Sequence, residues 1–217
     1  MRILYVILTC EKYYVTRCEI VKNTWLKNIG NDDYVFLSSI PDIDNKKLGY
    51  NTNDEYQYAP LKYVEFFNNY ELNNVDWVFF CDDDTFIFPH RLRELLKDVN
   101  GECVGRLGVC NNNPIISGSS PLFPITFISG GAGFGITSSV FYKIKDYLLS
   151  SQFTVCLNTD VTMGVWLREI GVDIEDRTDY LKAQNPDHPE NLKIDINKIV
   201  TFHYCNENNF TKLNELL

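Results

Sequence analysis

The most informative stretch of the chain reads Val75-Asp76-Trp77-Val78-Phe79-Phe80-Cys81 and continues directly into Asp82-Asp83-Asp84. The apolar run predicts a buried strand, but packing gives no reason for such a strand to end in three carboxylates. Like charges about 4 Å apart repel by roughly 1 kcal/mol in water and by several times more near a protein surface. A divalent cation with oxygen ligands would relieve that repulsion. Because open α/β sheets bind ligands at the carboxyl ends of their strands, the stretch predicts a metal site there.

Strands and helices alternate along the rest of the chain. Short apolar runs predict strands, and apolar residues at helical spacing predict helices. The expected strands are residues 2–10, 34–37, 75–81, 104–109 and 199–203. The expected helices lie near 15–28, 58–70, 137–149 and 160–170, with one more starting at Pro89, and loops are expected at 40–54, 111–129 and 176–197. This alternation predicts an α/β sandwich, and the lack of a Pro/Ser/Gly-rich linker predicts one domain over 1–217.

Composition and cysteine spacing argue against several classes of protein. The 217 residues carry a net charge of -9, which argues against nucleic-acid binding, since that is driven by a basic surface. The seven cysteines show no CxxC spacing, so we expect small buried thiols in a reducing compartment and no zinc ribbon. The apolar start at 2–10 is too short to span a membrane and lacks a signal-peptide layout. We therefore expect a cytoplasmic protein with no membrane segment, which could be one piece of a longer chain.

A glycine cluster forms the second notable feature. Four of the twelve glycines lie within residues 130–135. Glycines gather where the backbone approaches a ligand or adopts positive φ, although a structural turn is an equal alternative. The segment is expected to open the helix at 137–149 and to present backbone amides to an acceptor atom. It is not a P-loop, and a dinucleotide fingerprint would need glycines directly after the first strand.

Two single residues are candidates for chemistry. Asp160 is expected where a helix begins, either as its N-cap or as a general base that takes a proton from a hydroxyl. His203 ends the last expected strand, where a lone histidine is usually structural. An imidazole beside carboxylates would suit manganese better than calcium. A phosphatase of the haloacid-dehalogenase type is a weaker interpretation, because its Asp-x-Asp motif follows the first strand, whereas this triplet follows the third.

Taken in order, these motifs resemble those of metal-dependent GT-A glycosyltransferases of the Fringe and β-1,3-galactosyltransferase group. The resemblance extends from about residue 5 to 207. The segments that carry it are Thr9-Cys10-Glu11-Lys12 with Arg17 and Thr24-Trp25, the helix with Lys62, the DxD-type motif Trp77–Asp84, the glycine segment Phe127–Phe134, Asp160–Gly164, and Phe202-His203 with Glu207.

The resemblance implies a fold and an activity. The fold would be GT-A, a single Rossmann-like α/β/α sandwich with a mixed, mostly parallel central sheet. A nucleotide-binding half at about 1–100 would precede an acceptor half at about 101–217. The activity would be transfer of a hexose or deoxyhexose from a UDP-sugar, with Mn²⁺ or Mg²⁺, to a hydroxyl of a glycan or glycoprotein.

The resemblance also implies roles for individual residues. The metal ligands would be Asp84, His203 and Asp82, with Asp83 assisting through ribose or water. Asp160 would deprotonate the acceptor and give inversion at the anomeric carbon. The remaining residues expected to bind the donor or to line its cleft are Thr9, Arg17, Lys62, Gly130, Gly131 and Ala132.

Departures from the family leave alternatives open. Thr159 stands where the family often has a second acid, and Gly135 where Fringe proteins often have cysteine. The usual secretory anchor and disulfides are not evident, which suggests a compact enzyme of a microbe or a large DNA virus. A retaining transferase on the same scaffold is one alternative. A non-catalytic module that binds nucleotide sugars or carbohydrate is the other.

Overall fold

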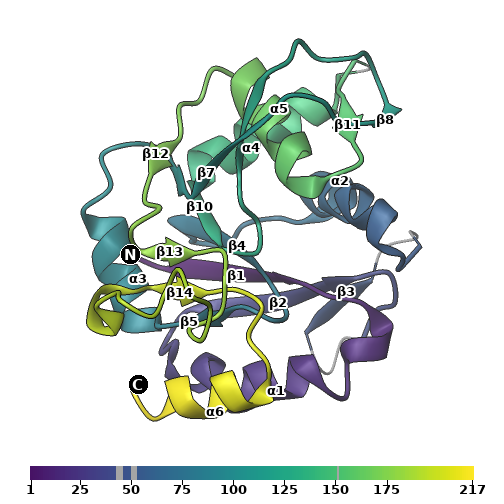
Figure 1. The fold of residues 1–217 in the computed structure, drawn as a ribbon. Helices are drawn as coiled ribbons and strands as arrows, with labels where there is room; N and C mark the ends of the chain where they lie inside the picture. Colours follow the sequence, from purple (N-terminus) through teal and green to yellow (C-terminus); the bar gives the residue numbers. More distant parts are fainter. Residues whose placement is uncertain (43–45, 50–52, 151) are drawn as a thin grey trace.

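A seven-stranded sheet forms the centre of the computed structural model, which describes residues 1–42, 46–49, 53–150 and 152–217 (Figure 1). The strand order is β12-β6-β10-β4-β1-β2-β3. The strand bounds are β1 (Ile3–Leu8), β2 (Asp33–Ser38), β3 (Lys47–Gly49), β4 (Trp77–Asp82), β6 (Cys103–Gly105), β10 (Phe134–Thr137) and β12 (Glu175–Asp176). Only β10 pairs antiparallel to its neighbours β4 and β6, and the other pairings are parallel. The expected mixed, mostly parallel sheet is confirmed.

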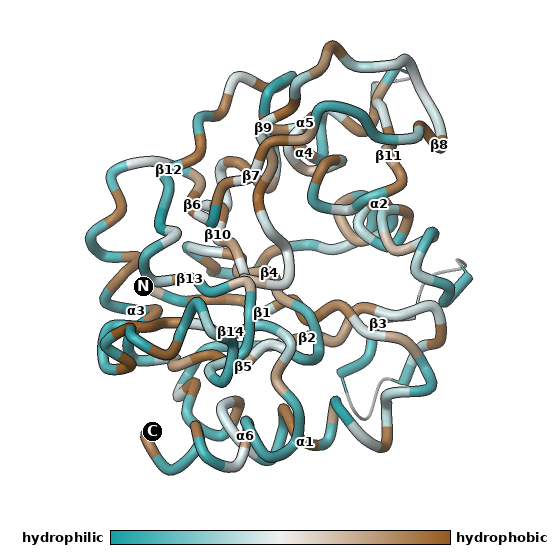
Figure 2. The backbone as a smooth tube through the Cα atoms, viewed as in Figure 1, coloured by the Kyte–Doolittle hydropathy of each residue, from teal (hydrophilic) through white to brown (hydrophobic). Residues whose placement is uncertain are grey.

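Helices cover both faces of this sheet. One face packs against α1 (Arg17–Asn23), α3 (Pro89–Lys97) and α6 (Glu207–Asn214), and the other packs against α2 (Ala59–Asn69), α4 (Ser138–Leu148) and α5 (Thr159–Glu169). In Figure 1, α1 and α6 lie below the central strands and α2, α4 and α5 lie above them. Hydrophobic stretches follow the central strands, between these two layers (Figure 2). The arrangement is the α/β/α sandwich that the sequence predicts.

Alternation along β4 explains why this strand is fixed in place. Successive side chains of a strand point to opposite faces of the sheet. Phe79 belongs to the hydrophobic cluster on the α1 side and Phe80 to the cluster on the α2 side, and both are fully buried. Burying one phenylalanine contributes about 1.5–3 kcal/mol. Because the strand is held from both faces, its carboxyl end has a defined position, and that end is Asp82.

A small second sheet connects the acidic triplet to the end of the chain. It contains β13 (Leu181–Lys182), β14 (Thr201–Phe202) and β5 (Phe86–Ile87). In the antiparallel pairing of β14 with β5, Phe202 lies opposite Phe86. The residue after β14 therefore meets the residues before β5, and this brings His203 to the triplet.

Several elements differ from the expectation. The expected helix at 15–28 is α1 followed by a separate 3-10 turn, η2 (Trp25–Asn28), because Thr24 leaves the helical region at φ -114° and ψ -112°. The expected strand at 104–109 is divided between β6 and β7 (Leu107–Cys110), which belong to different sheets.

The expected loops contain short strands. These are β3 within 40–54, β8 (Ile115–Ser117) and β9 (Ile125–Ile128) within 111–129, and β13 within 176–197. Residues 43–45 and 50–52 of the first loop lie outside the described part of the chain. Runs of two to four residues show too little alternation to reveal a strand.

Two other observations concern the chemistry of the fold. All seven cysteines are free thiols, and five of them are buried, as expected of small hydrophobic residues. No helix in the described residues has both the length and the hydrophobicity needed to cross a membrane.

Candidate functional site

The three carboxylates of the triplet are directed to two different sides. Asp82 is the last residue of β4, and the chain then turns, with the Thr85 amide donating to the Asp82 carbonyl at 3.1 Å. Asp82 and Asp84 both approach His203. Asp83, between them, bonds to Thr9 and Arg17 instead. The triplet is thus a pair of acids that share His203 and a third acid bound to Thr9 and Arg17, with Arg17 also reaching Asp84.

Asp82, Asp84 and His203 form a group with the chemistry of a metal site. Their ligand atoms all lie within 4.8 Å of one another. The Nε2 atom of His203 lies 3.1 Å from Asp84 Oδ1 and 3.5 Å from Asp82 Oδ2. Asp84 Oδ1 is buried, and no donor in the described part of the chain makes a well-aligned hydrogen bond to it. Two carboxylates and an imidazole that converge in this way fit Mn²⁺ or Mg²⁺, and the nitrogen ligand favours manganese.

The negative charges of Asp82 and Asp84 change the pKa of His203. Burial alone would lower the pKa of His203, but contacts with Asp82 and Asp84 outweigh it and raise that pKa to about 9. Without a metal, a protonated imidazole is therefore the cation that these carboxylates attract.

Asp83 anchors the carboxyl end of β1 and the first residue of α1. The Thr9 hydroxyl donates to Asp83 at 2.7 Å, and the Arg17 guanidinium donates to it at 2.8 Å. Burial raises the pKa of Asp83 to about 6 although both donors lower it. Arg17 also reaches Asp84 at 3.2 Å and lies over the ring of Tyr13 at 4.1 Å. Arg17 is held by two acids, yet 39% of its side chain stays exposed.

Lys62 is placed near the site but its ammonium group is already bound. It donates to the Thr9 carbonyl at 2.9 Å and to Asp54 at 2.6 Å, and its side chain is only 3% exposed. Asp54 also accepts the amides of Glu11 and Ser39. Asp54 is a site residue that the sequence analysis missed, because one acid in a polar loop has no distinguishing pattern.

The glycine segment separates His203 from Asp160. A Cβ on Gly131 would lie 2.0 Å from the His203 ring, and one on Gly130 would lie 2.7 Å from an Asp160 oxygen. The segment leads into β10 and not into the helix, so the expectation that it opens a helix is wrong. Because Gly130 and Gly131 lack a Cβ, the side chains of Asp160 and His203 can lie close to the backbone of this segment. Ala132 is fully buried in the core and does not line the cavity described below, contrary to expectation.

Asp160 lies in the first turn of α5. The N-cap residue of this helix is Asn158, so the expectation of Asp160 as N-cap is wrong. Burial and the charge of Asp82 raise the pKa of Asp160 to about 7, although the Gly130 amide and His203 oppose the rise. A carboxylate with a pKa near the working pH is suited to general base catalysis.

These residues border one cavity of about 470 Å³ at the carboxyl ends of β1 and β4. Its lining residues include six acids, three cationic side chains and three tyrosines. They are Asp54, Glu55, Asp82, Asp83, Asp84 and Asp160; Lys12, Arg17 and Lys62; and Tyr13, Tyr56 and Tyr204. The structure thus brings together Thr9, Arg17, Lys62, the triplet, Gly131, Asp160 and His203. Carboxylates outnumber cationic side chains here, so added positive charge would favour the binding of an anionic ligand.

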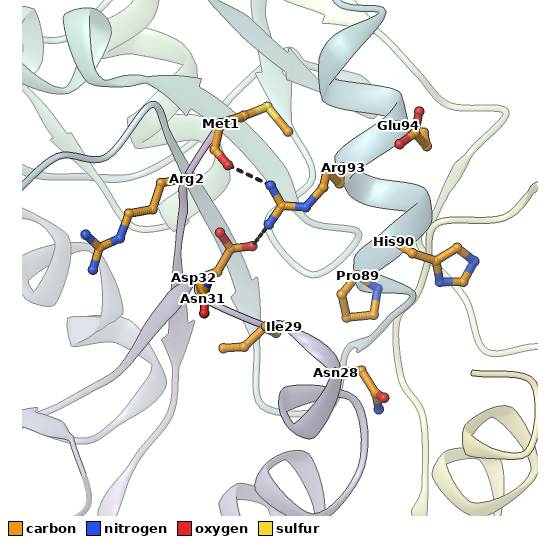
Figure 3. A pocket seen from close by; sticks show the side chains of 11 residues that line it. Met1, Arg2, Asn28, Ile29, Asn31, Asp32, Pro89, His90, Arg93 and Glu94 are labelled. Atoms are coloured by element: carbon orange, nitrogen blue, oxygen red, sulfur yellow. Dashed lines mark hydrogen bonds and ion pairs between the residues drawn. The ribbon is translucent and has the colours of Figure 1, made fainter.

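A second cavity, of about 510 Å³, lies at the opposite, amino ends of β1 and β2 (Figure 3). Its Arg93 donates to the Met1 carbonyl at 2.7 Å and pairs with Asp32. Asp32 also accepts the Ile3 amide at 2.9 Å. Because Arg93 and Asp32 already neutralise each other and bind the backbone, we assign this cavity a structural role.

Comparison with known proteins agrees with this geometry. Residues 1–216 match the sequence model of a family described as Fringe-like. The glycoprotein-N-acetylgalactosamine 3-beta-galactosyltransferase 1 of Xenopus laevis is 26% identical over 220 residues, which cover 94% of this chain and 57% of that protein. The human beta-1,3-N-acetylglucosaminyltransferase manic fringe is 26% identical over 178 residues, which cover 72% of this chain and 54% of that protein. The chain spans about half the length of these relatives.

A similar fold occurs in a glycosyltransferase involved in glycosylation of the major capsid of PBCV-1. The TM-score is 0.54, the identity is 11%, and the match covers 100% of both chains. At this identity the likeness concerns the fold alone. It confirms the expected GT-A architecture.

Proposed function

The chain belongs to the Fringe-like family, and we propose that it is a metal-dependent glycosyltransferase. It transfers a hexose or deoxyhexose from a UDP-sugar to a hydroxyl of a glycan or glycoprotein. The observation that carries this proposal is the meeting of Asp82, Asp84, His203 and Asp160 at one cavity, although they come from distant parts of the chain.

The charge of the cavity supports the need for a metal. Six carboxylates outnumber the three lysine and arginine side chains even when a protonated His203 is added, and Lys62 is already paired with Asp54. A diphosphate would be repelled from such a surface. Asp82, Asp84 and His203 would hold Mn²⁺ or Mg²⁺. The bound ion would supply the positive charge and the Lewis acidity that stabilise a UDP leaving group.

The chain's own residues divide the remaining tasks. Arg17 presents its partly exposed guanidinium to the donor, and Asp83 and Tyr13 hold it in position. Asp160 takes the proton of the acceptor hydroxyl as that oxygen bonds to the anomeric carbon. The bond from this carbon to the diphosphate oxygen breaks, and UDP leaves with the electron pair. Attack opposite the leaving group gives inversion.

The position of the Asp160 carboxylate at the cavity favours an enzyme over a non-catalytic binding module. A module that only binds nucleotide sugar needs Asp82, Asp84 and His203 (the metal trio) to hold the ion, but it does not need a general base. Removing the base is expected to cost about two or more orders of magnitude in turnover while UDP binding persists. A cytoplasmic location and a microbial or large-DNA-virus origin stay predictions from the sequence.

The test combines ligand binding with turnover. Thermal shifts with UDP and a panel of UDP-sugars, with Mn²⁺ and with EDTA, report binding, because a ligand of the folded state raises the melting temperature. Release of UDP reports turnover. Asp84→Asn should abolish the Mn²⁺-dependent shift, and Asp160→Asn should abolish turnover alone. Asp146→Asn, an exposed substitution on α4, is the matched control and should change neither. Unchanged UDP binding in EDTA and in Asp84→Asn would reject the metal assignment, and normal turnover of Asp160→Asn would reject the base.

A further inference from the structure

Two buried threonine hydroxyls bind the backbone of the glycine segment. The Thr85 hydroxyl donates to the Gly131 carbonyl at 2.7 Å, and the Thr201 hydroxyl donates to the Ala132 carbonyl. Both threonines are 0% exposed, and neither borders the cavity that holds the site. A ligand in that cavity therefore does not touch them. Any effect of these hydroxyls on the ligand has to pass through the glycine segment.

Each threonine belongs to a part of the chain that carries metal ligands. Thr85 directly follows the acidic triplet, and Thr201 begins β14, two residues before His203. The buried indole of Trp25 donates to the Thr85 carbonyl at 3.1 Å, which fixes the backbone of Thr85 independently. Thr201 is held by the antiparallel pairing of β14 with β5. The small sheet that brings His203 to the triplet thus also fixes the two hydroxyls.

The glycine segment meets site residues through its other contacts. The Gly131 backbone lies against the His203 ring, and the Gly130 backbone lies against the Asp160 carboxylate, because a Cβ at either glycine would overlap them. The Gly133 amide donates to the Gly130 carbonyl at 2.9 Å and closes a turn that contains both threonine-bound carbonyls. The segment is therefore a spacer between the metal trio and the base. The two threonines attach this spacer to the parts of the chain that carry the trio.

We propose that Thr85 and Thr201 are positioning residues that set the distance between the metal trio and Asp160. The inference rests on the proposed function and adds two residues that act on it from outside the cavity. The base must reach the acceptor hydroxyl while the diphosphate is held at the trio, and a misplacement of about 1 Å can cost about 100-fold in rate. A buried carbonyl that loses its donor is costly and turns toward another donor. Removing either hydroxyl therefore moves the spacer, and Asp160 with it.

The experiment separates turnover from binding. The substrates are the UDP-sugar and the p-nitrophenyl glycoside that together give the fastest UDP release with Mn²⁺. Thr85→Val and Thr201→Val remove the hydroxyl but keep a branched side chain, and each should lower kcat at least about tenfold. The KM for the UDP-sugar and the Mn²⁺ affinity from calorimetry should stay within about threefold, because the trio keeps its own contacts. Thr85→Ser and Thr201→Ser keep the hydroxyl and should retain at least about half of kcat.

Thr154→Val is the matched control. Thr154 is also buried, its hydroxyl donates to the Ser119 carbonyl at 2.8 Å, and it does not border the cavity that holds the site. Its valine variant should lose melting temperature as the other two do, yet keep the kcat of the parent. If a valine variant fails to fold, alanine and serine variants at the same position are compared instead, because they differ only in the hydroxyl.

The outcomes separate this inference from the proposed function. An active parent whose folded Thr85→Val and Thr201→Val variants keep kcat within about twofold would overturn the positioning role and leave the proposed function in place. Three other results would also overturn it: a loss that serine does not restore, an equal loss in Thr154→Val, or a loss of Mn²⁺ affinity as large as the loss of kcat. Absence of UDP release by the parent from every donor, with Mn²⁺ present, would overturn the proposed function and this inference with it.

Discussion

Replacing Gly131 with alanine should detach His203 from the two aspartates while the protein stays folded. The added methyl group would lie 2.0 Å from Cε1 and 2.3 Å from Nε2 of His203. Ordinary contact begins at 3.4 Å, so the ring must retreat by about 1.4 Å. Metal–ligand distances tolerate only about 0.2 Å of error. The displaced imidazole could then no longer join Asp82 and Asp84 around one cation.

The expected decrease in Mn²⁺ affinity follows from the loss of one of the three metal ligands. Substitution of residues that merely orient a metal ligand costs about 10–100-fold in affinity. Loss of the ligand itself should weaken Mn²⁺ binding at least about tenfold, which corresponds to about 1.4 kcal/mol. The backbone should accept alanine, because Gly131 is not among the residues with positive φ. The strain therefore falls on the His203 side chain.

Isothermal titration with Mn²⁺ measures the affinity, and the melting temperature in EDTA reports whether the variant is folded. Gly101→Ala is the matched control, because its methyl group would meet no atom closer than 3.7 Å, and it should bind Mn²⁺ normally. A folded Gly131→Ala variant with Mn²⁺ affinity within twofold of the parent would refute the assignment of His203 as a ligand in this geometry.

Two more predictions concern the charged groups of the cavity. Asp54→Ala removes the carboxylate that pairs with the buried Lys62 ammonium and should lower the free energy of unfolding by about 3 kcal/mol. Urea denaturation should show partial recovery when Lys62→Met is added, and a loss below about 1 kcal/mol in Asp54→Ala would contradict the role of the pair. Because Asp82 and Asp84 raise the pKa of His203 to about 9 in the metal-free protein despite its burial, a proton must leave before Mn²⁺ binds. Mn²⁺ affinity should therefore fall up to about tenfold between pH 8 and pH 7, and calorimetry in two buffers should detect about one released proton; binding that is independent of pH would speak against His203 as a ligand.

The sequence predicts the central part of the fold well because its signals there are strong. The runs that become β1 and β4 are long and apolar, and the helices α2, α4 and α5 differ from their expected bounds by one residue at each end. The short strands escape detection for a physical reason. Strands such as β5 and β13 contain two residues each and depend on tertiary pairing with β14.

The same limit applies to the candidate site. The triplet is visible because three adjacent acids are unusual after a buried strand. The place of His203 depends on the pairing of Phe202 with Phe86, which local sequence does not reveal. The expectation that Ala132 lines the cavity is wrong for a different reason. The two glycines that precede it lie against the site residues Asp160 and His203, yet its own side chain is buried in the core. Proximity in the sequence to a site glycine does not determine which side of the segment a side chain occupies.

The spacing of the triplet explains how one motif serves both the site and the fold. Asp82 ends β4, and Asp83 and Asp84 lie in the turn that follows, so the turn directs the three carboxylates to different partners. Asp82 and Asp84 accordingly meet His203, and Asp83 turns to Thr9 and Arg17. If Asp83 joined the other two acids, Arg17 would lose its shortest ion pair. Asp83 forms the shorter ion pair with Arg17, and Asp84 contacts both Arg17 and His203. The middle acid thus positions the Arg17 guanidinium beside the group of Asp82, Asp84 and His203.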